Sequence, residues 1–397
     1  MSKLRALVLG AALGLAGSQA LAADPGLTDK EITIGLFNPM SGPLVSFGYD
    51  SLYAAKMWYD DVNKKGGIHG RMIKTIIEDD KCSAQDVVAI VKKFVTVDNV
   101  FMINGGACSG PTVAAQEYVT REKVPLVMIN AAGDVAVFPP TRYVFGGAGG
   151  TQRSVGAGVM EFAIKQLKGQ RIAFISHDDD FGNANTATAL AVAKRLGGNV
   201  VAVERISPRI TDATAPLLNV RGANPDVILS TAYPAPAVLL AQKYGEFNMM
   251  KATLVQAVQG IPVPSVFVKN VGNDAALVNF YYSSPLNDLT NGPKQQKWQA
   301  MYKAAYPDRT PGAFMAYGLP LAMAITDALQ RAGKDLTREK FVDAMEKVDI
   351  ETGVTAGNTA FGPNRRDGYR GSIFIKFDGK IETLIPGAYF WNGTDGM

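Results

Sequence analysis

The chain has 397 residues, and 47% of them are hydrophobic, which is enough apolar material for more than one core. Lysine and arginine outnumber the acidic residues by 40 to 36, and charges of both signs alternate along the chain without a basic block. This pattern argues against nucleic-acid binding, and the length favours two lobes.

The N-terminal segment has the pattern of a secretory signal peptide. Lys3 and Arg5 precede an apolar run at residues 6–16, and small residues before Asp24 offer a cleavage site. The apolar run is too short to cross a membrane. We therefore expect residues 1–23 to be removed and the mature chain to be exported to the periplasm.

The first part of the mature chain alternates apolar runs with amphipathic stretches. This order predicts a parallel sheet with helices on both faces. Strands are predicted at residues 32–37, 72–78, 100–103 and 125–129, and helices at residues 48–64, 84–97 and 110–121.

The strand at residues 100–103 leads into a turn that suits an anion. Gly105 and Gly106 end the strand, and Ser109 or Gly110 can cap the next helix. The first N–H groups of a helix lack intrahelical partners and favour negative charge. A free carboxylate could bind these N–H groups with the Ser109 hydroxyl as a further donor. The alternative is an ordinary strand–helix turn.

After a glycine-rich segment at residues 144–150, which suggests a crossing between lobes, the alternation begins again. We expect an α/β chain with two doubly wound parallel-sheet lobes joined by a hinge of several crossings. Residues 27–146 plus 258–335 are assigned to an N-terminal lobe, and residues 147–257 plus 336–397 to a C-terminal lobe. Further strands are predicted at residues 171–176, 200–206, 226–230, 253–255, 279–282 and 371–377, and further helices at residues 152–167, 183–196, 213–220, 234–244, 293–306 and 311–331.

The chain has two cysteines, Cys82 and Cys108. Each follows a predicted strand, so both are expected at the carboxyl edge of one sheet. A cysteine pair in an exported protein suggests a disulfide. Two buried free thiols are the alternative.

Catalytic patterns are absent from the sequence. There are two histidines, His69 and His177, and only His177 stands beside acids, at residues 178–180. A metal site needs three or four converging ligands, and a hydrolase needs a nucleophile beside a base. The acids at residues 178–180 are predicted to cap the following helix. We expect no enzyme activity, no metal and no cofactor.

Aromatic residues collect in the loops predicted to follow the strands. Aromatic walls with a few polar donors are typical of a small-molecule site. The alternative is that each ring is an ordinary half-buried core residue. The aromatic residues concerned are Phe47, Phe181, Tyr233 and Tyr317.

Several runs, in order and at matching spacing, resemble the periplasmic leucine/isoleucine/valine-binding protein family. Its members are type I solute-binding proteins of ABC importers. The likeness extends over essentially the whole mature chain. The runs that carry it lie at residues 39–43, 47–48, 63–71, 79–82 and 106–109.

The resemblance implies a type I periplasmic binding protein fold with two lobes, three crossings and closure on a ligand. It implies a disulfide between Cys82 and Cys108. It also implies that Ser109 binds the ligand carboxylate with backbone groups near Ala107. The other positions that match ligand-binding residues of the family are Gly133, Asp134, Phe47, Phe181 and Tyr233.

The sequence departs from the family at the group that binds a ligand ammonium. The family places an acid in a loop that here has the sequence V-Q-A-V-Q-G at residues 255–260, with neutral Gln256 and Gln259. A family threonine is replaced by Asp134. Because an ammonium without a countercharge is costly to bury, either Asp134 replaces the acid or the ligand is not an amino acid. Aromatic acids, aliphatic acids and short amides are then candidates.

The function expected from the sequence is that of a monomeric carrier. It would capture a small carboxylate-bearing ligand between the lobes and dock on an ABC-transporter membrane permease. The alternative is a ligand-sensing module that acts through a chemoreceptor or another signalling partner.

Overall fold

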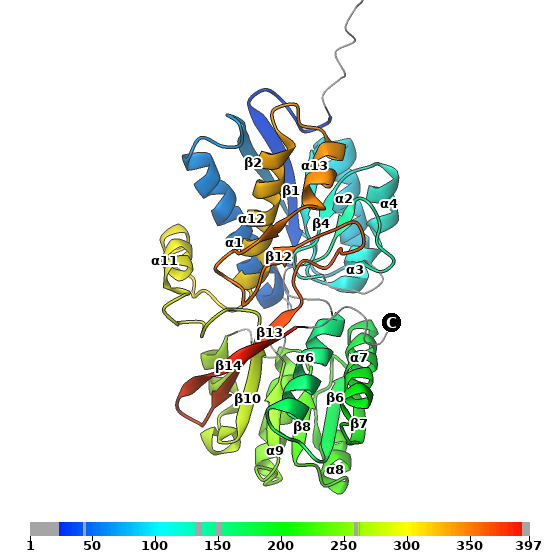
Figure 1. Ribbon diagram of the computed structural model, residues 1–397, viewed down its shortest axis with the longest axis vertical. Coiled ribbons are helices and arrows are strands. Elements are labelled where there is room, and N and C mark those ends of the chain that lie inside the picture. Colours follow the sequence, from blue (N-terminus) through cyan, green and yellow to red (C-terminus); the bar gives the residue numbers. More distant parts are fainter. Residues whose placement is uncertain are drawn as a thin grey trace, which may run out of the picture.

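The computed structural model describes residues 24–42, 45–131, 137–147, 152–257, 261 and 263–390, and only the backbone of Ser46, Phe47 and Gln152. Two lobes, each built around its own sheet, lie one above the other in Figure 1. No helix in these ranges has the length and apolarity that spanning a bilayer demands. The expected signal peptide lies outside the described residues.

The first lobe is built on a five-stranded sheet with the order β2-β1-β3-β4-β5, in which every neighbouring pair is parallel. Its core has two layers, because side chains alternate between the faces of each strand. In β1, Leu36 belongs to one layer and Phe37 to the other. The strands are β1 (Glu31–Asn38), β2 (Met72–Asp79), β3 (Met102–Gly105), β4 (Leu126–Val127) and β5 (Val144–Phe145).

Helices cover both faces of the first sheet. α1, α12 and α13 supply one layer of the core, and α2 and α4 supply the other. Gly35 lets α2 approach β1, since a Cβ at this position would lie 2.6 Å from the Phe94 ring. The helices are α1 (Val45–Lys64), α2 (Ala84–Thr96), α3 (Ser109–Val113), α4 (Gln116–Arg121), α11 (Gln296–Ala305), α12 (Met315–Ala332) and α13 (Arg338–Met345).

The second lobe is built on a seven-stranded sheet with the order β14-β13-β10-β9-β8-β6-β7. The five strands from β6 to β10 are parallel, whereas β13 and β14 join antiparallel at one edge. The strands are β6 (Ile172–His177), β7 (Val200–Ile206), β8 (Val227–Ser230), β9 (Thr253–Gln256), β10 (Phe280–Ser284), β13 (Gly371–Phe377) and β14 (Glu382–Phe390).

The second sheet is also covered on both faces, by α6 and α7 on one side and by α8, α9 and α10 on the other. The helices are α6 (Gln152–Lys165), α7 (Asp180–Leu196), α8 (Thr214–Gly222), α9 (Pro234–Glu246) and α10 (Pro264–Val271), and a 3₁₀ turn, η2, spans Asp274–Leu277. The expected α/β class with two sheet-based lobes is confirmed.

The lobe boundaries need two corrections. Residues 258–335 were assigned to the first lobe, but β10 pairs with β9 and places the segment up to residue 284 in the second. Residues 336–397 were assigned to the second lobe, but α13 packs on the first sheet, where the Phe341 ring meets Phe101 at 6.0 Å. The short pair β11 (Asp349–Ile350) and β12 (Thr359–Ala360) follows α13.

The chain therefore passes between the lobes three times: after β5, after β10 and after β12. Two of the three passages meet, because the Gly146 N–H donates to the Arg366 carbonyl oxygen. The buried Arg366 guanidinium donates to Thr141 O at 2.9 Å and to Glu346 Oε1 at 2.6 Å. These contacts anchor the third passage to the first lobe. Part of the expected crossing at residues 144–150 lies outside the described residues.

Two expected helices differ in detail. The helix predicted for residues 110–121 is divided into α3 and α4. The long apolar helix predicted for residues 311–331 is present as α12, with Pro320 in its interior.

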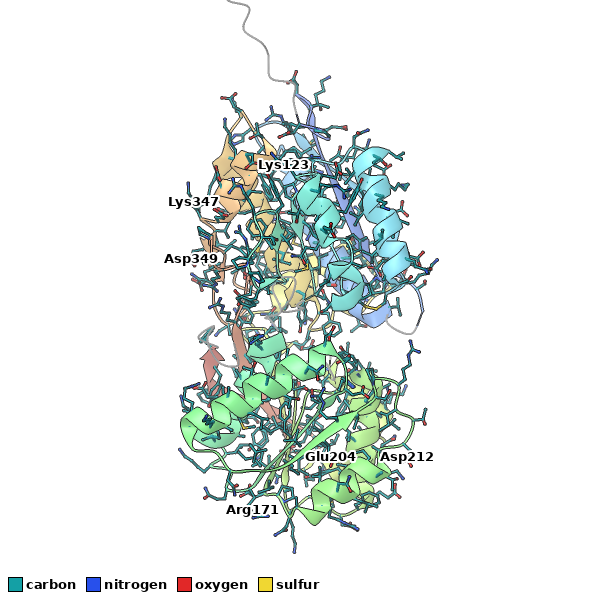
Figure 2. The ribbon with its side chains drawn as sticks, turned by 90° about the vertical axis from the view of Figure 1, so that its right-hand side faces the viewer. Lys123, Arg171, Glu204, Asp212, Lys347 and Asp349 are labelled. Atoms are coloured by element: carbon teal, nitrogen blue, oxygen red, sulfur yellow. A yellow bond between two sulfur atoms is a disulfide. The ribbon has the colours of Figure 1, made fainter. Side chains whose placement is uncertain are left out.

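Charged side chains of both signs, such as Lys347, Asp349 and Arg171, lie exposed on the outer surfaces of the two lobes (Figure 2).

Candidate functional site

The loop after β3 is shaped by a glycine. Gly106 has φ +96°, and a Cβ there would lie 2.5 Å from Thr112 Oγ1, so any larger residue would displace that side chain. Thr112 Oγ1 donates to Cys108 O at 2.8 Å and closes the turn. The residue in the cap position of α3 is Cys108, and Ser109 is the first residue of the helix. The expectation that Ser109 or Gly110 caps the helix is therefore wrong.

Cys82 and Cys108 form the expected disulfide, with their Cα atoms 5.6 Å apart. They do not follow neighbouring strands, because β1 lies between β2 and β3. The bond therefore joins two loops across the end of β1. It fixes the loop that carries Ala107, which is buried, and Ser109, which is partly exposed.

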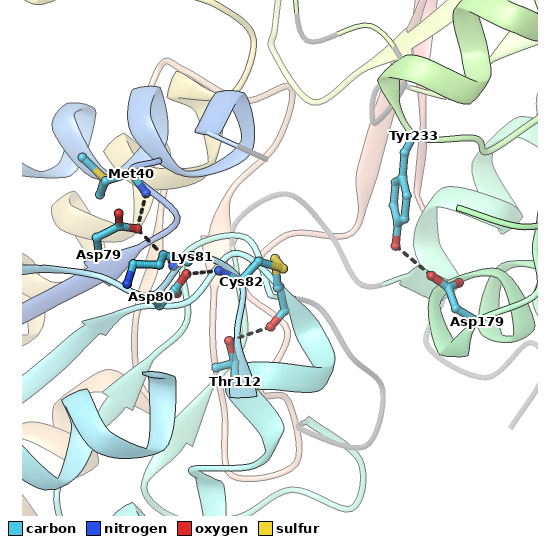
Figure 3. The surroundings of a disulfide bond; sticks show 9 residues. Met40, Asp79, Asp80, Lys81, Cys82, Thr112, Asp179 and Tyr233 are labelled. Atoms are coloured by element: carbon cyan, nitrogen blue, oxygen red, sulfur yellow. Dashed lines mark hydrogen bonds between the residues drawn. A yellow bond between two sulfur atoms is a disulfide. The ribbon is translucent and has the colours of Figure 1, made fainter. Parts of the chain in front are cut away.

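Two aspartates before Cys82 hold the neighbouring backbone (Figure 3). Asp79 accepts hydrogen bonds from the Met40 N–H at 2.8 Å and from Ser41 Oγ at 2.5 Å, so it fixes the loop after β1. Asp80 Oδ1 accepts the Cys82 N–H at 2.7 Å, while Oδ2 is buried without a hydrogen-bond partner among the residues that the structure describes. Burial raises the pKa of Asp80 to about 6.

A second set of side chains lies at the carboxyl ends of β6 and β8. The Tyr233 hydroxyl donates to Asp179 Oδ2 at 3.3 Å, and Asp179 Oδ1 accepts the Gly182 N–H at 2.9 Å as the cap of α7. The centroids of the Phe181 and Tyr233 rings are 5.1 Å apart. These two aromatic residues were predicted to wall one site, and the structure places them in contact.

His177 holds the backbone of Tyr233 in place. Its Nε2 accepts the Tyr233 N–H at 2.8 Å, and its Nδ1 is within 3.3 Å of the Ile206 carbonyl oxygen, to which it donates. Burial lowers the pKa of His177, against the opposing charge of Asp179. A neutral ring with both nitrogens engaged has a structural role, so His177 is neither a base nor a metal ligand in this arrangement.

Tyr233 remains a hydrogen-bond donor. Burial, followed by the charge and hydrogen bond of Asp179, raises the pKa of Tyr233 well above its ordinary value. The acids at residues 178–180 were predicted to cap the following helix, and Asp179 does so. The hydrogen bond between Asp179 and Tyr233 and the role of His177 were not predicted.

Gln256, expected at the ligand, is engaged with the backbone. Its side chain is buried, and its Nε2 donates to Ala232 O at 3.0 Å and to Ala257 O at 3.2 Å. These bonds tie the loop after β8 to the end of β9. The expected ligand residues Gly133, Asp134 and Gln259, and the side chain of Phe47, lie outside the described residues.

The two sets of residues belong to different lobes. Figure 3 shows the disulfide on one side of the space between the lobes and the Tyr233–Asp179 pair on the other. Within the described ranges, three or more His, Cys, Asp or Glu side chains nowhere converge as a metal site would require. The site thus consists of a backbone loop opposite a small group of aromatic and acidic side chains.

A model of the periplasmic binding protein family matches residues 31–379. The chain belongs to this family. Among periplasmic binding proteins it is similar to the Leu/Ile/Val-binding protein homolog 7 of Brucella abortus, with 26% identity covering 95% of this chain and 96% of that protein. It is also 25% identical to the leucine-specific-binding protein of Salmonella typhimurium, covering 82% and 87% of the two chains. The resemblance found in the sequence is confirmed.

Solved structures show the same fold. The branched-chain amino acid transporter substrate-binding protein LivJ of Streptococcus pneumoniae, in complex with isoleucine, has a TM-score of 0.75 at 22% identity, covering 90% of this chain and 99% of that one. A solute-binding protein of an ABC transporter from R. palustris, in complex with benzoate, also has a TM-score of 0.75, at 15% identity, covering 89% and 95%.

Proposed function

We propose that the mature chain is an extracytoplasmic solute-binding protein of an ABC importer, which captures a small carboxylate-bearing ligand between its lobes. The observation that carries this proposal is the position of the Cys82–Cys108 disulfide, which lies across the space between the lobes from the Tyr233–Asp179 pair (Figure 3). Ala107 and Ser109 flank Cys108 in the loop that this disulfide holds. A ligand that touches both sides favours the closed arrangement by the difference in its affinity for the two arrangements.

The first-lobe loop suits a carboxylate. Backbone N–H groups and the Ser109 hydroxyl are neutral donors, and hydrogen bonds to a charged acceptor are stronger than those between neutral groups. Gly106 allows the tight turn that presents them. Ala107 and Ser109 are proposed as carboxylate-binding residues, with Gly133 and Asp134 as a second loop and Phe47, Phe181 and Tyr233 as aromatic walls. Gln256 and Gln259 are proposed on the second-lobe side.

The names of the relatives support transport. Two relatives are named as Leu/Ile/Val-binding and leucine-specific-binding proteins, and neither name describes an enzyme. We infer that the chain acts in the periplasm as a monomer, without a cofactor and without catalysis, and that its closed form docks on a membrane permease. The alternative is a ligand-sensing module that acts through a chemoreceptor or another signalling partner. A pull-down experiment that compares binding to the permease with binding to the receptor would distinguish the two functions.

A thermal-shift screen of the mature protein tests the proposal. The panel contains branched-chain amino acids, benzoate-type acids and short amides. A ligand at about 100 times its dissociation constant stabilises the folded protein by about 2.7 kcal/mol, which raises the melting temperature clearly. We expect a rise with at least one carboxylate-bearing compound, and a smaller rise in Ser109→Ala. A panel without any rise would contradict a carboxylate-binding function.

A further inference from the structure

The carboxylate of Asp179 is held by neutral donors in the part of the chain that the structure describes. Its hydrogen bonds come from the neutral Gly182 N–H and the neutral Tyr233 hydroxyl, and no lysine or arginine of the described chain forms an ion pair with it. Arg205 on the neighbouring strand β7 donates instead to Thr186 Oγ1 at 2.9 Å and to Asn183 Oδ1 at 2.7 Å. The negative charge of Asp179 therefore remains available to pair with a cationic group of a ligand.

Asp179 also retains room for donors. A carboxylate has about four lone-pair sites, and protein donors use two of them here. The side chain is half-buried, the Tyr233 hydroxyl contacts it, and the Phe181 ring packs beside the Tyr233 ring. A carboxylate beside aromatic faces is a chemical setting that favours an ammonium group, because both attract a cation.

The acid that the family resemblance places against an ammonium is missing from residues 255–260. Asp179 stands on a different loop of the same lobe, and the carboxylate-binding loop of the first lobe lies across the space from it (Figure 3). The two charged ends of a small amino acid would therefore each meet a suitable partner, one on each lobe.

We propose that Asp179 is the counter-ion of a ligand ammonium, so that the preferred ligands of this chain are amino acids rather than acids without an amine. The inference rests on the proposed function and narrows its ligand class. An acid without an amine would leave the Asp179 charge with only the N-terminus of α7 and the Tyr233 hydroxyl to stabilise it when the lobes close over it. A desolvated charge without a counter-ion is costly. Asp179 thus selects for amino acids and against acids such as benzoate.

The test compares matched ligands by isothermal titration calorimetry on the mature protein. L-leucine is paired with 4-methylpentanoate, and L-phenylalanine with 3-phenylpropanoate, which differ from the amino acids only by the missing amine. We expect the wild type to prefer the amino acid of at least one pair by about tenfold to a hundredfold, the range of one charge-assisted hydrogen bond.

Asp179→Asn removes the charge while keeping an oxygen that can cap α7, since asparagine is as good a cap as aspartate. Its amide nitrogen takes the place of Oδ2 and can donate to the Tyr233 hydroxyl, which then becomes the acceptor. We expect this variant, and Asp179→Ser, to lose most of the preference for the amino acid while the affinity for the deaminated acid stays the same or rises. Asp212→Asn is the matched control, because Asp212 is an exposed acid of the same lobe whose Oδ1 accepts the Thr214 N–H at the start of α8. We expect it to keep the wild-type preference.

The outcomes separate the inference from the function on which it rests. Tight binding of the deaminated acids with no preference for the amine, or an unchanged preference in both Asp179 variants, would overturn the role of Asp179 and leave the carrier function standing. Binding of none of the four compounds would overturn this inference, whereas the ligand class of the proposed function is tested separately by the wider thermal-shift panel.

Discussion

The two lobes present surfaces of different kinds to the space between them. On the first lobe the surface is mainly backbone, held by the Cys82–Cys108 bond and by the Thr112 hydrogen bond to Cys108 O. On the second lobe it is made of side chains, with Asp179 and Tyr233 held by hydrogen bonds. The first surface depends on the path of the chain and is proposed to bind a carboxylate. The second depends on which side chains are present and is proposed to distinguish one acid from another.

The largest effect is expected from removing the covalent link of the first surface. Replacing both cysteines with serine (Cys82→Ser with Cys108→Ser) should lower the free energy of unfolding by about 3–4 kcal/mol, because the bond closes a loop with a sequence separation of 26 residues. Urea unfolding measures the loss. A reducing agent should destabilise the wild type and leave the double variant unchanged, and equal stability of the two proteins would contradict the assignment.

The next largest effect is expected from replacing a glycine of the second surface. In Gly182→Ala the new Cβ would lie 1.8 Å from the His177 carbonyl oxygen, so the first turn of α7 must move. We expect a loss of about 1–3 kcal/mol of unfolding free energy and weaker ligand binding, because Asp179 caps this turn. Gly222→Ala, where a Cβ meets nothing within 4 Å, is the control and should be close to neutral. Similar losses in both variants would contradict the close approach.

The two surfaces should respond to pH in opposite directions. For Asp80, whose pKa is raised to about 6 in the folded protein, the folded state binds the proton more tightly than the unfolded state. Its contribution to stability is therefore lost as the pH rises through about 6. Asp80→Asn should then be more stable than the wild type at pH 7.5, by no more than about 3 kcal/mol. Urea unfolding of both proteins at pH 4.5 and 7.5 measures the difference, which should shrink at the lower pH.

His177 has the opposite sign, because burial lowers its pKa in the folded protein. The unfolded state then binds the proton more tightly, so stability falls as the pH drops below the ordinary histidine value of about 6.5. His177→Gln, which keeps an acceptor for the Tyr233 N–H, should flatten this acid-side fall. A His177→Gln profile parallel to that of the wild type between pH 5 and 7 would contradict a buried neutral ring.

The smallest effect is expected from the Tyr233 hydroxyl. Tyr233→Phe removes the donor to Asp179 while keeping the ring beside Phe181. The loss of unfolding free energy should be about 1 kcal/mol or less, because the hydrogen bond is 3.3 Å long and half-buried. Thermal unfolding measures it. A loss much greater than that of Gly182→Ala would mean that the hydroxyl supports more of the lobe than its one bond to Asp179 explains.

Local sequence patterns were enough to predict much of the fold. The apolar run at residues 32–37 became β1 because buried parallel strands need continuous apolar residues. The lobe boundaries could not be found in this way. Whether the strand at residues 280–284 joins the first or the second sheet depends on its pairing with β9. The sequence pattern of a strand does not indicate with which other strand it pairs.

The candidate site was predicted unevenly for a similar reason. The loop at Gly106 and the cysteine pair carry strong local signals, and the aromatic pair of Phe181 and Tyr233 was predicted. Which of the acids at residues 178–180 bonds to Tyr233 was not predicted. A shift of one residue decides which carboxylate reaches both the Gly182 N–H and the Tyr233 hydroxyl. The bracing of Tyr233 by His177 likewise depends on two strands that are adjacent only in the folded sheet.

Closure of the lobes on a ligand is the most direct consequence of the ligand contacts proposed for both surfaces. Small-angle X-ray scattering of the mature protein, with and without the amino acid that gives the largest thermal shift, measures this closure. We expect the radius of gyration to fall on ligand binding in the wild type, and to stay at the unliganded value in Asp179→Asn at a concentration that saturates only the wild type. An unchanged radius of gyration in wild-type protein that calorimetry shows to be saturated would contradict ligand capture between the lobes.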